Sequence, residues 1–173
     1  MTVAVRRGRP GDHAQLAALY AAAFPTEHLL PLVDAVLISN DCLASLVAVE
    51  GASVVGHVLL TRCSVPPDAG QLALLGPLAV LPAFQRRGIG TALVKEALLQ
   101  MAGAAVLRIF VLGDPAYYGR FGLAPEREVE PPFPIPPAWQ NAWQSLALSG
   151  AGVVRPGVLC VPATWRDPLL WTS

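Results

Sequence analysis

One short segment in the middle of the chain carries the residues best suited to chemistry, Gln85-Arg86-Arg87-Gly88-Ile89-Gly90-Thr91. It lies between an apolar run ending at Val80 and a helical pattern beginning near Gly88. The first turn of a helix has unpaired backbone N–H groups and a partial positive charge, which favour a bound phosphate. The two glycines let an oxygen approach the backbone, and the two arginines add positive charge. The segment therefore predicts a pyrophosphate site.

The sequence does not match the motifs of nucleotide-binding loops, nucleophile elbows or metal sites. No Gly-Lys-Ser/Thr string follows a glycine as in a P-loop, and Leu93 stands where a dinucleotide fingerprint needs its third glycine. The serine in Gly51-Ala52-Ser53-Val54-Val55-Gly56 has one residue too many for a nucleophile elbow and falls in a predicted hairpin. The three histidines show no metal-binding spacing, so no metal is predicted.

The elements that must position this segment follow from apolar periodicity and from turn residues. A strand at Val3–Arg6 precedes two helices, which are followed by an antiparallel hairpin. A strand, helix and strand then favour parallel pairing. The predicted elements are helices from Arg9 and from Leu29, hairpin strands 44–49 and 53–61, a loop at 66–70, a strand buried on both faces at 72–80, a helix from Gly88 to Gly103, a strand at 106–112, a short helix at 116–120, an irregular proline-rich stretch at 125–137, and strands at 142–148 and 158–161.

Composition limits the class of protein. The 173 residues are 54% hydrophobic and 14% charged, which suits a single compact domain over residues 1–173. Twelve basic residues balance twelve acidic ones, so no positive field would attract nucleic acid or an anionic membrane. The apolar stretch from Leu72 to Phe84 is too broken to span a bilayer, and the N-terminus lacks a signal peptide. With three widely spaced cysteines that read as reduced thiols, we expect a cytoplasmic protein.

The string Gln85-x-x-Gly88-x-Gly90 resembles the acetyl-CoA signature of the GCN5-related N-acetyltransferase (GNAT) superfamily. Its context, Leu75–Pro82 before and Gly113–Leu123 after, is similar to the YhbS-like bacterial branch, from Val3 to about Val161. The resemblance implies an α/β GNAT fold. This is a mixed, mostly antiparallel sheet of six to seven strands with helices on both faces, in which the parallel fourth and fifth strands splay apart to hold acetyl-CoA.

The resemblance also assigns contacts to the cosubstrate. The pantetheine arm would pair with backbone groups of Leu78, Ala79 and Val80, with Leu78 or Val80 donating its N–H to the thioester carbonyl. The pyrophosphate would be wrapped by Gln85, Arg86, Arg87, Gly88, Ile89, Gly90 and Thr91. No metal takes part.

The proton donor to the leaving thiolate would be Tyr118, counted back from Phe121-Gly122-Leu123, with Tyr117 as the alternative. A phenol bears a proton at neutral pH, although both rings could instead pack beneath the cofactor. Asp114 or backbone would replace an asparagine that often contacts pantetheine in the family. The general base stays open, because the strand starting Leu72-Ala73-Leu74-Leu75 has no carboxylate. The remaining candidates are Glu27, His28, Glu50 and His57, the last more often structural in such a position, or water.

We therefore expect an N-acetyltransferase that moves the acetyl group from acetyl-CoA to a primary amine of a small molecule, or of a protein or peptide, by direct attack in a ternary complex. The alternative is a module that binds or senses acyl-CoA without turnover. The acceptor would contact the variable stretches Pro25–Leu30 and Pro125–Trp143, where Phe133, Trp139 and Trp143 either line a pocket or cover the core or a dimer contact. The acceptor amine, the acyl-chain preference and the choice between monomer and homodimer stay open.

Overall fold

The computed structural model describes residues 2–148 and 153–172, without the side chains of residues 68–70. A seven-stranded sheet has the order β1-β2-β3-β4-β5-β8-β6, and a two-stranded sheet pairs β7 with β9. The strands are β1 Val3–Arg7, β2 Cys42–Glu50, β3 Ser53–Val65, β4 Asp68–Val80, β5 Arg108–Leu112, β6 Ala124–Pro125, β7 Val129–Glu130, β8 Trp143–Ala147 and β9 Gly157–Val158. The α-helices are α1 His13–Ala23, α2 Leu30–Leu37, α3 Ile89–Gly103 and α4 Pro115–Tyr118.

Strand directions agree with the predicted fold class. Strand β2 is antiparallel to both β1 and β3, β5 is antiparallel to β8, and β4 is parallel to β5. The parallel pairs cover Leu72 to Leu74 of β4, and the strand itself continues to Val80. The mixed, mostly antiparallel sheet with a parallel β4/β5 pair is confirmed.

The chain divides into two compact units, Met1–Thr61 with Leu75–Gln100, and Arg62–Leu74 with Met101–Ser173. Strands β3 and β4 and helix α3 contribute residues to both units. The expectation of a single domain stays a prediction.

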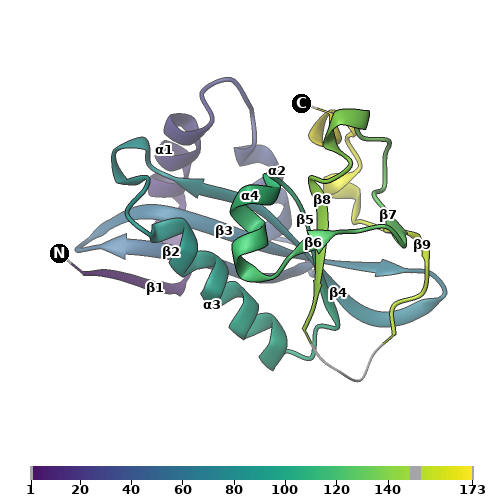
Figure 1. Ribbon diagram of the computed structural model, residues 1–173. Helices are drawn as coiled ribbons and strands as arrows, with labels where there is room; N and C mark the ends of the chain where they lie inside the picture. Colours follow the sequence, from purple (N-terminus) through teal and green to yellow (C-terminus); the bar gives the residue numbers. More distant parts are fainter. Residues whose placement is uncertain (1, 149–152, 173) are drawn as a thin grey trace. The chain divides into compact units, whose positions relative to one another are not determined.

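In the first unit, helices α1 and α2 cover one face of strands β1 to β3, and α3 covers the other (Figure 1). The two faces can be followed in neighbouring residues of β3, because successive side chains of a strand point to opposite sides. A Cβ at Gly56 would lie 3.0 Å from Ile89 and from Leu93 of α3, whereas His57 contacts Tyr20 of α1. Every residue from Val54 to Thr61 is consequently buried.

Helices α1 and α2 form because apolar residues recur on one side of each. Leu16, Leu19 and Tyr20 of α1 are buried, and Pro25 follows shortly after its end. Asp12 precedes α1, where its carboxylate accepts hydrogen bonds from Arg6 and from the Arg9 N–H at 2.8 Å. The Arg6 hydrogen bond holds the pKa of Asp12 at about 2, so this turn keeps its negative charge.

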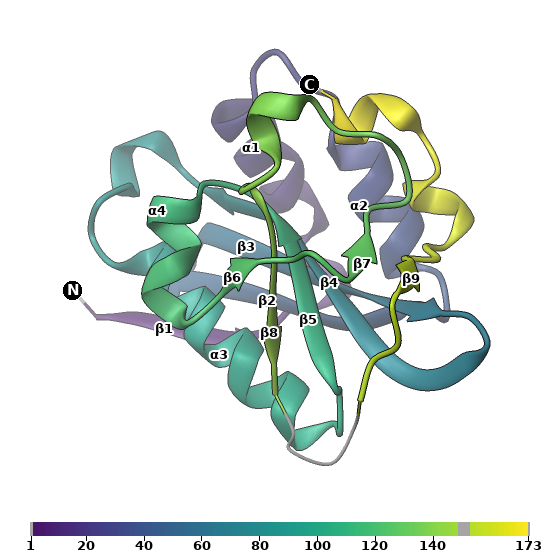
Figure 2. The same cartoon turned by 45° about the vertical axis from the view of Figure 1, so that its right-hand side comes forward.

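In the second unit, β5 lies beside β8, and β8 beside β6 (Figure 2). The core contains Trp143, which stacks on Phe110 with ring centroids 5.5 Å apart and meets Trp171 edge-on at 5.9 Å. The Trp143 indole N–H donates to the Val129 carbonyl at 2.7 Å. Aromatic packing therefore joins β5, β8 and the C-terminal turns.

A buried carboxylate, Glu126, fixes the chain between β6 and β7. Its exposed fraction is 6%, and one oxygen accepts hydrogen bonds from three successive backbone N–H groups, those of Arg127, Glu128 and Val129. The other oxygen accepts from Arg108 and Ser145. Burial alone would raise the pKa of Glu126, but the bonds from Ser145, the backbone and Arg108 together lower it.

The structure differs from the predicted elements around β4. The predicted loop at 66–70 is too long, since β3 extends to Val65 and β4 begins at Asp68, which leaves Pro66 and Pro67 as the connection. Proline and glycine are common in turns, so Pro66, Pro67 and Gly70 led to the prediction of a loop where β4 begins. The predicted burial on both faces holds for Leu72–Leu75, but Gly76–Leu78 and Val80 are half-buried. The proline-rich stretch at 125–137 also contains β7 and the last residue of β6.

Candidate active site

The end of β4 presents backbone donors along one edge. The Leu81 N–H donates to the Val55 carbonyl of β3 at 2.9 Å. Because N–H groups alternate in direction along a strand, those of Leu78 and Val80 point to the edge away from β3. Pro77 has no N–H, and the side chain of Ala79 is buried. The N–H groups of Leu78 and Val80 are thus not used by β3, and their contact with the thioester carbonyl stays a prediction.

The segment between β4 and α3 forms a cradle of unpaired N–H groups. A short turn at Pro82–Phe84 leads into Gln85, whose side-chain amide donates to the Val80 carbonyl at 3.2 Å. The first helical hydrogen bond of α3 runs from the Ala92 N–H to the Gly88 carbonyl at 2.9 Å. Across the described chain, no acceptor takes a hydrogen bond from the backbone N–H groups of residues 86–91. Such a run of free donors at a helix start suits an anion.

Left-handed backbone conformations shape this cradle. Gly88 has φ +80° and Arg86 has φ +59°. Glycine adopts this region without penalty, whereas an arginine is strained there. The Arg87 guanidinium lies 5.1 Å from the centre of the Phe84 ring, and both arginines are exposed. The sequence analysis named both residues, but it did not predict the left-handed backbone of Arg86, because nothing in its residue type signals a positive φ.

Tyr118 lies in the second unit, at the end of helix α4. Asp114 caps that helix by accepting the Ala116 N–H at 2.9 Å. The Tyr118 ring lies directly on Gly113, where an added Cβ would overlap Cε2 and lie 2.9 Å from Cδ2 of the ring. Burial raises the pKa of the Tyr118 phenol above its ordinary value, and Tyr117 raises it further. The phenol keeps its proton at neutral pH, and the close contact of its ring with Gly113 was not indicated by the sequence.

Comparisons with known proteins settle the family. A family model described as Acetyltransferase (GNAT) family matches residues 13–122. The chain belongs to this acetyltransferase family. The uncharacterized N-acetyltransferase YjhQ of Escherichia coli K12 is 30% identical over 124 residues, which cover 69% of this chain and 68% of YjhQ. The uncharacterized N-acetyltransferase YhbS of the same strain is 29% identical over 114 residues, covering 65% of this chain and 68% of YhbS.

Solved structures agree with this assignment. A GNAT family acetyltransferase from Brucella melitensis, solved in complex with acetyl-CoA, is 30% identical with a TM-score of 0.77, over 95% of this chain and 98% of its own. Escherichia coli YhbS in complex with CoA is 24% identical with a TM-score of 0.85, over 95% of this chain and 92% of its own, and shows the same fold. The predictions of a YhbS-like GNAT enzyme with acetyl-CoA as cosubstrate are confirmed.

Both tyrosines of this GNAT acetyltransferase lie close together. Tyr117 is half-buried and meets Tyr118 edge-on with ring centroids 5.0 Å apart. The Arg120 guanidinium covers the Tyr117 ring at 4.6 Å. Tyr118 is the more buried ring, at 8% exposed. The assignment of Tyr118 as the acid, with Tyr117 as alternative, stays a prediction.

His57 is placed in the core and does not face solvent. Its exposed fraction is 0%, Nδ1 lies 2.8 Å from the Tyr20 hydroxyl, and Nε2 lies 2.9 Å from the Ser45 hydroxyl. Burial lowers its pKa to about 4. Both ring nitrogens are occupied, so the structural interpretation of His57 is supported over a role as general base. The other candidates lie at the surface, Glu27 and His28 exposed and Glu50 half-buried.

Trp143 does not line an acceptor pocket. It is 2% exposed and packs between Phe110 and Trp171, so the pocket interpretation is wrong for this residue and the core interpretation holds. Its position near a proline-rich loop suggested exposure, but β8 places its ring inside. Phe133 and Trp139 are half-buried.

Two properties of the described residues concern the predicted partners. Among residues 2–148 and 153–172, no three His, Cys, Asp or Glu side chains gather as a metal site would require. Within those same residues, no helix combines the length and apolar character needed to cross a membrane.

Proposed function

We propose that this GNAT acetyltransferase transfers the acetyl group from acetyl-CoA to a primary amine of a small molecule, by direct attack within a ternary complex. The observation that carries the proposal is the run of free N–H groups at residues 86–91, opened by left-handed Arg86 and Gly88. A diphosphate is the group in acetyl-CoA that such a cradle fits. The acetyl-CoA bound to the Brucella relative supports the same cosubstrate here.

The proposed contacts divide acetyl-CoA between two stretches of backbone. Residues 85–91 hold the pyrophosphate, with Arg86 and Arg87 adding charge and Thr91 a hydroxyl. Leu78, Ala79 and Val80 run along the pantetheine arm. The N–H groups of Leu78 and Val80 point away from β3, so one of them can stabilise negative charge developing on the thioester oxygen.

The proposed chemistry is aminolysis of a thioester. The lone pair of a neutral amine forms the new C–N bond while the C–S bond breaks. Tyr118 gives its phenolic proton to the departing sulfur, and the amine loses a proton to water or to a base not yet identified. The phenolate then regains a proton from solvent. The high pKa of buried Tyr118 suits a donor that must hold its proton until the thiolate forms.

The acceptor we favour is a small amine, with a protein or peptide amine as the second class. Twelve basic and twelve acidic residues leave no net charge to attract a long basic tail. All three cysteines are free, which fits a reducing cytoplasm. We include neither nucleic acid nor a membrane among the partners. The enzyme would act as a monomer or as a homodimer.

Two glycines, Gly88 just before α3 and Gly103 at its end, test the cradle. A Cβ at Gly88 or at Gly103 would meet nothing within 4 Å, but only Gly88 has a positive φ. Gly88→Ala strains the loop by about 1 kcal/mol or more and should weaken acetyl-CoA binding roughly tenfold in calorimetry. Gly103→Ala is the matched control and should bind as wild type. Equal affinity of both variants for acetyl-CoA would show that the cradle is not part of the binding site.

An amine panel with acetyl-CoA then separates the enzyme from a sensing module. Thiol release that depends on an amine is expected from the wild type, and Tyr118→Phe should bind acetyl-CoA normally but turn over more slowly. Binding without release against every amine would favour the acyl-CoA-sensing alternative. Unchanged turnover in the phenylalanine variant would show that Tyr118 is not the proton donor.

A further inference from the structure

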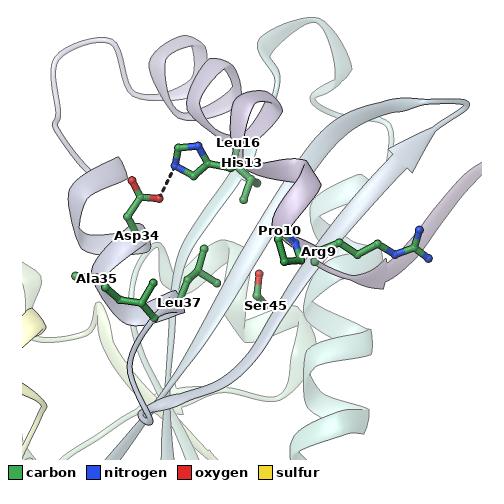
Figure 3. Close-up of a pocket in the computed structure, with 10 residues that line it drawn as sticks. Arg9, Pro10, His13, Leu16, Asp34, Ala35, Leu37 and Ser45 are labelled. Atoms are coloured by element: carbon green, nitrogen blue, oxygen red, sulfur yellow. Dashed lines mark hydrogen bonds and ion pairs between the residues drawn. The ribbon is translucent and has the colours of Figure 1, made fainter.

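The first unit contains a pocket of about 740 Å³ at the start of α1 and the end of α2 (Figure 3). Apolar side chains form much of its wall, namely Pro10, Leu16, Ala35, Leu37 and Ile38. Ser45 of β2 also lines it. None of the residues 78–91 borders this pocket, so it is separate from the proposed pyrophosphate cradle. Its volume and mainly apolar lining are those of small-molecule sites.

A hydrogen-bonded chain ends at the pocket wall. The Tyr20 hydroxyl, His57 and the Ser45 hydroxyl are linked by contacts of 2.8 and 2.9 Å. Tyr20 is 2% exposed, and His57 is the one partner of its hydroxyl within the described chain. A buried hydroxyl hydrogen without an acceptor is costly, so Tyr20 must donate to Nδ1.

The direction of this chain decides the polarity of the pocket. With Nδ1 accepting, the neutral imidazole carries its proton on Nε2 and donates it to Ser45 Oγ. The Ser45 hydroxyl hydrogen is then left over, and Ser45 Oγ has no second partner in the described chain. Gly8 leaves room for this hydroxyl, because an added Cβ there would lie 2.8 Å from Oγ. Ser45 therefore offers the pocket one hydrogen-bond donor.

The charged groups lie at the exposed rim of the pocket, where the side chains of His13 and Asp34 are 61% and 40% exposed. The Asp34 carboxylate is paired with the His13 ring at 3.1 Å (Figure 3). The Arg9 side chain extends away from the other lining side chains. An ion would have to give up its hydration for an apolar wall, whereas a neutral molecule would not.

We propose that this pocket binds an uncharged, mostly apolar small molecule through a carbonyl oxygen that accepts the Ser45 hydroxyl hydrogen. The apolar walls on α1 and α2 hold the body of the ligand, and the donor fixes its orientation. This site does not depend on the acetyl-transfer proposal, because its residues are separate from the cradle.

The test uses prodan, an uncharged naphthalene ketone whose emission responds to burial and to hydrogen bonding of its carbonyl. Titration is done with coenzyme A at saturation, so that the cofactor site is not available to the dye. We expect saturable, blue-shifted emission from the wild type, and an affinity about tenfold lower in Ser45→Ala, which removes the donor. Ser45→Thr keeps a hydroxyl and should restore most of the affinity.

A pair of tryptophan substitutions locates the bound dye. Ala35→Trp fills the pocket and should abolish binding, while Ala22→Trp on the exposed surface of α1 adds the same ring outside it and should bind as wild type. Urea unfolding of each variant identifies any that fails to fold, and Leu37→Trp then replaces Ala35→Trp. The proposal is overturned if emission does not saturate in the presence of coenzyme A, if Ser45→Ala binds the dye as tightly as the wild type, or if pocket-filling leaves the affinity unchanged.

Discussion

Replacing His57 with glutamine should make the stability of the protein less sensitive to acid. Burial lowers the His57 pKa from 6.5 to about 4, with a smaller opposing effect from Asp12. On unfolding, the imidazole returns to its ordinary pKa. Below pH 6.5 the unfolded chain therefore binds a proton that the folded chain does not bind, and stability falls as the pH falls. Above pH 6.5 both states are neutral and the effect is absent.

The size of the effect follows from the two pKa values. A difference between 6.5 and about 4 corresponds to a limit of about 3 kcal/mol in the free energy of unfolding, at about 1.36 kcal/mol per pKa unit. The same two-state titration gives about 1 kcal/mol at pH 5.5 and most of the limit at pH 4. His57 is fully buried, so solvent screening does not reduce these values.

Glutamine is the informative substitution because it does not titrate but retains one acceptor and one donor. Its amide oxygen can accept from Tyr20, and its amide nitrogen can donate to Ser45. Urea unfolding at a series of pH values, followed by tryptophan fluorescence, gives a stability curve for each protein. Titrations of Asp12 and Glu126 occur in both proteins and cancel in the difference. Parallel curves between pH 6.5 and 4 would show that His57 is not held neutral by its surroundings.

Three further predictions test other parts of the molecule. Gly56→Val places methyl groups against Ile89 and Leu93, which a Cβ would already approach to 3.0 Å. It should cost about 1–3 kcal/mol of stability by overpacking, measured by urea midpoint, and unchanged stability would contradict the packing. Glu126→Gln removes the partner of Arg108 and should cost about 3 kcal/mol at neutral pH. Since the Glu126 pKa is lowered, that difference should shrink as the pH falls through it, and a pH-independent difference would count against the charge. Gly113→Ala should displace the Tyr118 ring and lower kcat with little change in the KM for acetyl-CoA, and normal kcat would deny Gly113 a positioning role.

The features that could be predicted from sequence are those encoded by neighbouring residues. Helix α3 follows from apolar residues four apart, and the cradle from two glycines at its start. The parallel pairing of β4 and β5 follows from the length of the strand-helix-strand unit. Each of these depends on local periodicity or on a connection rule.

Features that escaped prediction depend on residues far apart in the sequence. The His57 network joins residues separated by 37 and 12 positions, and Glu126 meets Ser145 from 19 positions away. No sequence periodicity or motif indicates such long-range contacts. The same reason explains Trp143, whose burial depends on Phe110 and Trp171, and the early start of β4, where proline and glycine outweighed the strand pattern.

Gly56 and His57 face opposite sides of the sheet, and this limits which changes in the length of the turn before β3 the protein can tolerate. If β3 slid by one residue against its neighbours, an imidazole would be forced toward α3, where even a methyl group is tight. The hydroxyls of Tyr20 and Ser45 would then face a position without a ring nitrogen. A one-residue deletion in the turn at Gly51-Ala52 therefore cannot be absorbed by slippage of β3 and must be taken up within the turn itself.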